Sequence, residues 1–207
     1  SKQLYGSPKD KFIEDKNRVI DMAHMLYEIL CGVDASLSQQ NFSENLTAQD
    51  VVNELNLRFS GYFGEGTVEA KISDGIIADA AAGGDTVKIR EGSMFASREI
   101  DIYEVHEGWV HVGTTMNGRR QPVSKFLSIG PPHCASTQEG LAVIMEIFTF
   151  RSYPRRAKQI NDRIICIDKA EDGANLLDII EYFRTEGYSE KDCMTNALRV
   201  FRGGNIL

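Results

Sequence analysis

Hydrophobic positions in the first third of the chain recur at helical spacing. From about Phe12 to Cys31, apolar residues return every three or four positions, and Gly32 follows where a helix would stop. A second such segment runs from about Ala48 to Tyr62, and Thr47 can cap its N-terminus. The pattern therefore predicts two helices joined by a polar loop.

Alternation of apolar and polar residues replaces this period in the next segment. Thr67 to Ile72 alternates, Asp74-Gly75 is a hairpin turn signal, and Ile76 to Ala82 continues the pairing. Gly83-Gly84-Asp85 marks another turn before the short strand Thr86 to Arg90. A small antiparallel sheet of about three short strands is predicted, with its first two strands joined as a hairpin.

Helical patterning dominates the remainder. Helices are predicted at about Arg98–Met116, Thr137–Phe150, Ala174–Thr185 and Glu190–Phe201, with an apolar, strand-like run at Ile164–Ile167. Asn117-Gly118 is expected to end the first of these helices in a left-handed turn. A chain of 207 residues can form one well-buried domain, so we predict a single, mostly helical α+β domain over residues 1–207.

Charge and cysteine usage narrow the classes of partner. Lys and Arg total 23 against 30 Asp and Glu, a net charge of −7, which disfavours nucleic-acid and anionic-membrane partners. The cysteines, Cys31, Cys134, Cys166 and Cys193, form no CxxC pair, so a thiolate zinc site is disfavoured. Free thiols and the lack of an apolar signal core or membrane span predict a cytoplasmic protein.

The segment HEGWVH, inside the predicted helix from Arg98, carries candidate chemistry. It contains His106, Glu107 and His111. Neutral imidazoles bind zinc, and an adjacent carboxylate can accept a proton from a metal-bound water. The segment therefore suggests one zinc ion held by the two histidines, with Glu107 as general base. The alternative is a pair of partly buried helix histidines that make ordinary hydrogen bonds.

The spacing of these histidines conflicts with an ideal α-helix. At about 100° per residue, a residue five positions on lies roughly 140° around the helix, against about 40° for four positions. A one-residue π-bulge, eased by Gly108, would bring the rings to one side. Otherwise Glu107 and His111, four residues apart, could be the ligand pair. We favour the bulge because it leaves Glu107 free beside the metal-bound water.

A downstream segment, TQEGLAV, offers the third ligand. Its Glu139 lies near the start of a predicted helix, 28 residues after His111, which is enough chain to return to the histidines. Two histidines and one glutamate are a common protein shell for catalytic zinc. Glu146, two turns later on a similar face, could hold a ligating imidazole or could be a structural carboxylate.

Taken together, HEGWVH, NGRRQP, TQEGLAV and RVFRGG resemble the microtubule-associated tyrosine carboxypeptidase family, whose bacterial members are called flavohaemoglobin expression-modulating QEGLA-motif proteins. The resemblance extends from the LYGSP segment at Leu4 to Gly204, and so covers nearly all of the chain. It implies a zincin-like metallopeptidase that removes a C-terminal residue, as animal relatives remove Tyr from tubulin tails. His106, His111 and Glu139 match the zinc ligands, and Glu107 matches the catalytic base.

The predicted function is zinc-dependent removal of a Tyr- or Phe-like residue from a peptide or protein C-terminus. Arg199 and Arg202 are candidates for binding the substrate carboxylate, or they complement a helix end. An extended substrate is expected to pair with the strand Thr86 to Arg90. In the family further motifs follow RVFRGG, so the chain is expected to be shortened at its C-terminus.

Two other functions fit the same residues. One is a non-catalytic regulatory or interaction module with a structural metal, and the other is a metal endopeptidase of broad specificity. A structural zinc site needs no water-activating base and closes its fourth position, so Glu107 separates the first of these from an enzyme. The sequence predicts no particular oligomeric state.

Overall fold

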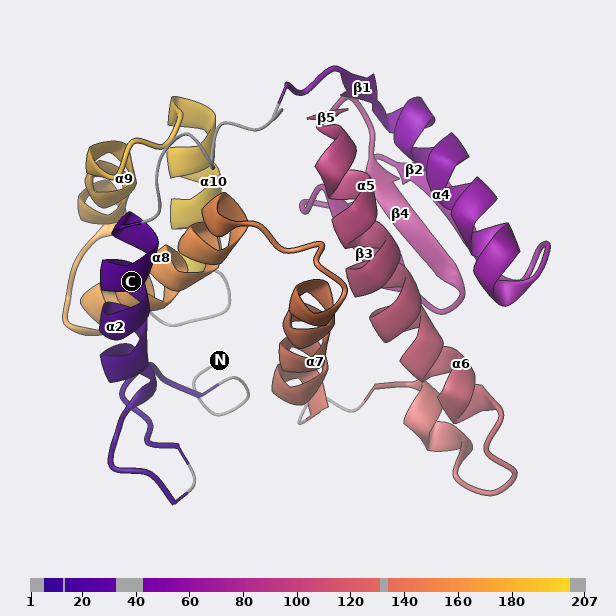
Figure 1. The fold of residues 1–207 in the computed structure, drawn as a ribbon, viewed down its shortest axis with the longest axis horizontal. Coiled ribbons are helices and arrows are strands. Elements are labelled where there is room, and N and C mark those ends of the chain that lie inside the picture. The colour runs from indigo at the N-terminus through magenta and orange to yellow at the C-terminus, as the bar shows by residue number, and fades with distance from the viewer. Residues whose placement is uncertain (1–5, 13, 33–42, 131–133, 202–207) are drawn as a thin grey trace. The chain divides into compact units, whose positions relative to one another are not determined.

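The computed structural model describes residues 6–12, 14–32, 43–130 and 134–201. The chain divides into two compact units, Ser1–Ser38 with Tyr153–Leu207 and Gln39–Ser152. Helices predominate and the strands are short, so the predicted α+β class is confirmed (Figure 1). Among the described helices, none is long and apolar enough to cross a membrane. The single metallopeptidase-like domain stays a prediction.

The first unit is built from helices. It contains α2 (Val19–Cys31), α8 (Pro154–Glu171), α9 (Leu176–Thr185) and α10 (Glu190–Val200). Asn175 and Ser189 cap α9 and α10 through their side chains, and Pro154 occupies the first turn of α8. The strand predicted at Ile164–Ile167 is wrong. These residues lie within α8, where Ile165 and Cys166 belong to its buried side.

The second unit packs two helical segments on one face of a small sheet. Its first helix, α4 (Ala48–Phe63), begins at Thr47, whose hydroxyl accepts a hydrogen bond from the Asp50 amide at 3.2 Å as predicted. The sheet contains β2 (Glu69–Ser73), β3 (Ala80–Gly83) and β4 (Thr86–Arg90), and a separate pair joins β1 (Leu46–Thr47) to β5 (Met94–Phe95). The shared core consists largely of Val51, Leu55, Phe59, Val68, Ala70, Val87, Ile89, Phe95, Ile100 and Val112.

The sheet differs from the prediction in its pairing. Its strand order is β2-β4-β3, with β4 parallel to β2 and antiparallel to β3, so the sheet is mixed. The hairpin predicted at Asp74-Gly75 is wrong, whereas the turn before β4 is confirmed, with Gly84 at a φ of 68°. Because β4 is the central strand, it has no free edge to offer a substrate.

The two edges of this sheet have different neighbours. On the β2 edge, the Asn56 side chain donates to the Ala70 carbonyl at 3.1 Å and accepts from the Ala70 amide at 2.7 Å. Asn56 thus occupies backbone groups that another strand would use. On the β3 edge, the Ala82 amide donates to the Glu107 carboxylate at 2.8 Å. The β3 edge therefore lies beside the candidate site.

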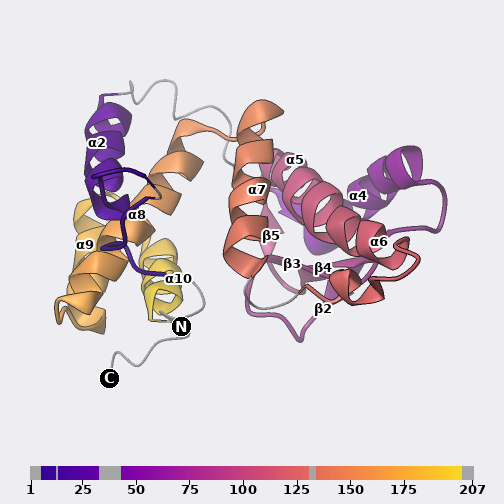
Figure 2. The same cartoon turned by 90° about the horizontal axis from the view of Figure 1, so that it is seen from below.

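One long helix, made of three consecutive segments, crosses the sheet next to α4 (Figures 1 and 2). These are α5 (Ser97–Tyr103), a π-helical segment η1 (Glu104–Val112) and α6 (Gly113–Arg119). The Gly113 amide donates to the Gly108 carbonyl, a bond that spans five residues. The predicted widening of this helix between the histidines is present, and it extends over more than one turn.

Two glycines in this long helix allow close packing. At Gly108 a Cβ would lie 2.8 Å from Cζ of the fully buried Phe59, so α4 and η1 meet there without room for a side chain. At Gly118 a Cβ would lie 2.6 Å from the Ser128 Cα in the short helix η2 (Lys125–Ser128). Gly118 is helical, and the helix ends at Arg119, so the predicted left-handed stop at Asn117-Gly118 is wrong.

Gly108→Ala is expected to overpack the contact between η1 and α4. Gly61→Ala, in α4, is the matched control because its Cβ would meet nothing within 4 Å and it carries the same gain in helix propensity. Chemical denaturation should show Gly108→Ala to be less stable than Gly61→Ala by about 1–3 kcal/mol. Equal stability of the two variants would contradict the close approach of Phe59.

Candidate metal centre

The π-helical segment brings the two histidines together. In η1 the turn is one residue wider, so the residue five positions on takes the place that the fourth has in an α-helix. The imidazole centroids of His106 and His111 lie 4.9 Å apart, at 69° to one another. Both side chains are largely buried, with 12% and 14% of their surface exposed. The geometric conflict found in the sequence is thus resolved by the backbone.

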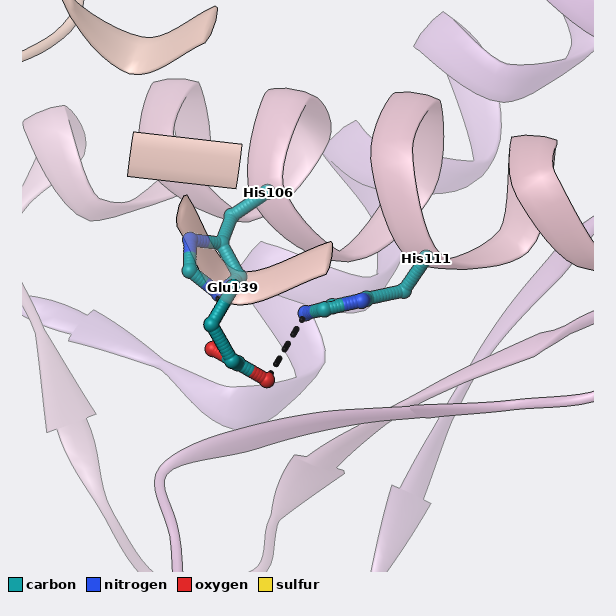
Figure 3. Close-up of side chains that lie close together, drawn as sticks. All are labelled: His106, His111 and Glu139. Carbon is teal, nitrogen blue, oxygen red and sulfur yellow. Dashed lines mark ion pairs between the residues drawn. The ribbon is translucent and has the colours of Figure 1, made fainter. Parts of the chain in front are cut away.

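Glu139 reaches both histidines from another helix, α7 (Ala135–Phe148). One carboxylate oxygen lies 3.4 Å from Nε2 of His106 and the other 3.5 Å from Nε2 of His111. Figure 3 shows the carboxylate at the tips of the two rings, which project from the same helix. Ligand atoms of the three residues all lie within 4.8 Å of one another, and 61% of the Glu139 side chain is exposed.

The far side of each imidazole is held by a second residue of α7. Nδ1 of His106 lies 2.7 Å from a carboxylate oxygen of Glu146, which is fully buried. Nδ1 of His111 lies 3.2 Å from Oε1 of Gln138. Both Nε2 atoms are therefore the ones that face Glu139. The sequence left open whether Glu146 contacts an imidazole or is a structural carboxylate, and the structure shows the contact with an imidazole.

Charges around His106 favour a cation. Burial disfavours the charged imidazole, but hydrogen bonds with Glu139 and Glu146 and the charges of Glu107 and Glu146 outweigh it and raise the pKa of His106 to about 9. These carboxylates gather negative charge about a point that two imidazole nitrogens also face. A divalent cation at this point would neutralise part of that charge.

Glu107 lies outside the three-residue group. Its Oε2 accepts a hydrogen bond from the Ala82 amide on β3. The edge strand therefore holds one oxygen of the carboxylate, and the other oxygen takes no part in this bond. Glu107 follows His106 in the chain, and its charge acts on the His106 imidazole, so it lies near the cluster although it is not one of the three residues of the group. The i+4 spacing had also offered Glu107 and His111 as the ligand pair. The structure instead groups His111 with His106 and Glu139.

The donor set fits zinc. Two imidazole nitrogens and one carboxylate are a usual protein shell for catalytic zinc, and the outer nitrogens of both rings have acceptors, as ligating histidines generally do. The exposure of Glu139 leaves one side of the group open to solvent, where a water or substrate could reach an ion. A structural site would instead close this position.

An ion-pair network anchors the ligand-bearing elements, and sequence reasoning missed it. Arg58 of α4 contacts Asp101 at 2.7 Å and Glu104, the first residue of η1, at 2.9 Å. Arg151, three residues after α7, contacts the same Asp101 at 2.8 Å. The network ties α4, the start of η1 and the end of α7 together. These pairs join residues far apart in the sequence, and no local pattern indicates them.

The two arginine candidates are not among the described residues of the unit that holds the cluster. Arg199 is on α10, in the first unit rather than the unit that holds the cluster, and Arg202 lies outside the described residues. Their role in binding a substrate carboxylate stays a prediction. Trp109 stacks on Tyr62 with ring centroids 5.0 Å apart, which is a packing contact between η1 and α4.

Comparison with known families places this geometry in context. The family model described as microtubule-associated tyrosine carboxypeptidase matches residues 1–207. The chain belongs to the microtubule-associated tyrosine carboxypeptidase family. The match spans both compact units and confirms the resemblance seen in the motifs. No curated protein and no solved structure gives a significant match.

Membership of the tyrosine carboxypeptidase family implies carboxypeptidase-type activity on a protein substrate. The family's description names neither a metal nor a site residue. Within the described residues, the group formed by His106, His111 and Glu139 is the one arrangement with metal-ligand geometry. This group is therefore the candidate site for the carboxypeptidase reaction.

Proposed function

We propose that this chain is a zinc-dependent carboxypeptidase that removes a Tyr- or Phe-like residue from the C-terminus of a peptide or protein. The observation that carries the proposal is the convergence of His106, His111 and Glu139 on one point, with Glu107 held next to it. Family membership supports the carboxypeptidase part, and the donor set supports zinc. The exposed side of Glu139 favours a catalytic over a closed structural site.

The residues divide the reaction between them. His106, His111 and Glu139 would hold one zinc ion, whose chemistry there would be to lower the pKa of a bound water to about 7 and to polarise the scissile carbonyl. Glu107 accepts a proton from the attacking water as the new C–O bond forms. It then delivers this proton to the leaving amine as the C–N bond breaks. The second proton of the water also passes to the amine, so the shortened peptide leaves with a new carboxylate and the released amino acid with an ammonium group.

An extended substrate would pair with β3 rather than with β4. On the β2 edge Asn56 takes both the amide and the carbonyl of Ala70, whereas on the β3 edge Glu107 takes the Ala82 amide. A peptide added along β3 would bring its backbone close to Glu107, which contacts the same strand. We propose β3 as the substrate-binding edge. The free cysteines among the described residues agree with the cytoplasmic location that we propose.

Zinc content and peptide cleavage test the proposed function together. The wild-type protein should bind one zinc ion and release the last residue from peptides ending in Tyr or Phe. His106→Ala and Glu139→Ala should lose zinc, whereas His24→Ala, an exposed histidine on α2, should keep it. Glu107→Gln should keep zinc and lose about 10²–10⁴-fold in kcat.

Three results would overturn the proposal. Unchanged zinc content in both ligand variants would contradict the site itself. Bound zinc without cleavage, and without an effect of Glu107→Gln, would favour a regulatory module with a structural metal. Internal cleavage of longer peptides would instead indicate an endopeptidase.

Ala82→Pro tests the contact between β3 and the general base. Proline removes the amide that donates to Glu107, and an edge strand tolerates proline where the amide points away from its neighbour. Zinc binding should persist while kcat falls about tenfold to hundredfold, the equivalent of the 1.5–3 kcal/mol that a hydrogen bond to a charged group contributes. Ala82→Gly keeps the amide and should keep the activity. Equal kcat in both variants would show that the contact has no catalytic role.

A further inference from the structure

Three polar groups next to the metal centre form a closed hydrogen-bonded ring. The Thr114 hydroxyl donates to the His111 carbonyl at 3.0 Å. Nε2 of Gln138 donates to the Thr114 oxygen at 2.6 Å, and Oε1 of Gln138 lies 3.2 Å from Nδ1 of His111. The ring starts and ends on His111, and Gln138 is the residue that precedes the candidate ligand Glu139.

The chemistry of each group fixes the direction of these bonds. A hydroxyl has one proton, and that of Thr114 is given to the His111 carbonyl, so toward Gln138 its oxygen can only accept. The Gln138 amide must therefore present its NH₂ to Thr114 and its oxygen to His111. An oxygen facing Nδ1 accepts, so Nδ1 carries a proton. In the neutral ring the lone pair of His111 is then on Nε2, the atom that faces Glu139.

The opposite arrangement needs three groups to change together. Thr114 would have to leave the carbonyl and donate to Gln138, the amide would have to turn, and Nδ1 would have to accept. Nε2 of His111 would then carry a proton and could not bind a metal. At His106 both nitrogens face carboxylates: Glu146 is the closer acceptor, 2.7 Å from Nδ1, and Glu139 lies 3.4 Å from Nε2.

We propose that Gln138, oriented by Thr114, is a positioning residue that holds His111 in the tautomer whose Nε2 is free to bind a metal. The inference rests on the proposed function, because it concerns the same site. It gives α7 three roles within three turns: Glu139 supplies a ligand, Glu146 orients His106, and Gln138 orients His111. Gln138 and Thr114 are assigned no part in the chemical step and act through His111.

The tautomer of His111 can be measured without metal or substrate. Nitrogen-15 NMR of the metal-free protein, at a pH where the ring is neutral, should show a proton on Nδ1 of His111 in the wild type. Gln138→Leu should populate the other tautomer, and Gln138→Glu, which keeps an acceptor, should not. Thr114→Val should act like a weaker Gln138→Leu, and Thr114→Ser should restore the wild-type state.

Zinc affinity provides the second readout. Gln138→Leu should weaken zinc binding about 10–100-fold, the usual loss when a partner of a ligating histidine is removed, and Gln138→Glu should retain it. Glu146→Leu is the matched variant on the same helix: it should weaken zinc binding while the His111 tautomer stays unchanged. A wild-type tautomer and wild-type zinc affinity in Gln138→Leu would overturn the inference.

Failure of the inference and failure of the proposed function are distinguishable. If the wild type binds and uses zinc but Gln138→Leu changes neither tautomer nor affinity, only the role of Gln138 is wrong. If the wild type does not bind zinc, the proposed function fails, and the NMR comparison still decides whether Gln138 sets the tautomer. Thermal unfolding of each variant shows whether it is folded before either readout is compared.

Discussion

The extra residue in each turn of η1 is the constraint on which the site depends. An α-helix would point His106 and His111 to different sides, whereas the π-helical segment places their rings 4.9 Å apart. A π-helix is seldom stable by itself, so its surroundings must maintain it. Phe59 packs against Gly108 on one side, and the Ala82 amide contacts Glu107 on another. The buried face of the sheet and the geometry of the ligands are therefore parts of one arrangement.

The helix α7 carries the other residues that contact the two histidines of η1. Its one face provides Glu139 and the acceptors for both outer imidazole nitrogens, so a small rotation of α7 would disturb all three contacts. The ion pairs of Arg58 and Arg151 with Asp101 oppose such a movement, because they link the residues just before η1 and just after α7. The buried residues of α7 are Ala142 and Glu146, so this helix buries little apolar surface and its polar contacts carry most of the argument for its position.

Local patterns in the sequence predicted what depends on local chemistry. The helices at α4, α7, α9 and α10, the Thr47 cap, the turn before β4 and the widened helix between the histidines all follow from spacing or from short motifs. The parallel pairing of β2 with β4 could not be predicted in this way. A turn signal such as Asp74-Gly75 indicates a bend but does not indicate which strand pairs with which. The run Ile164–Ile167 was ambiguous, since a few consecutive apolar residues suit a strand or one side of a buried helix.

Long-range contacts account for the other omissions. Gly118 was expected to stop a helix, but its actual role is to allow close packing against the backbone at Ser128. No pattern in the sequence indicates that these two residues are in contact. Gln138 and Thr114 could be recognised only after the rotation of α7 against η1 was known. Glu139 could be predicted from the sequence because its motif accompanies HExxxH. Glu146 could be predicted because it lies two helical turns further on.

X-ray absorption at the zinc edge is the most direct test of the central claim, that η1 and α7 together form one zinc site. The protein loaded with one equivalent of zinc should show a first shell of nitrogen and oxygen at about 2.0–2.2 Å with scattering from two imidazoles. His111→Ala should lose zinc and with it this spectrum, whereas Glu107→Gln should give the spectrum unchanged. A shell with sulfur at about 2.3 Å, or an unchanged spectrum in His111→Ala, would contradict the account.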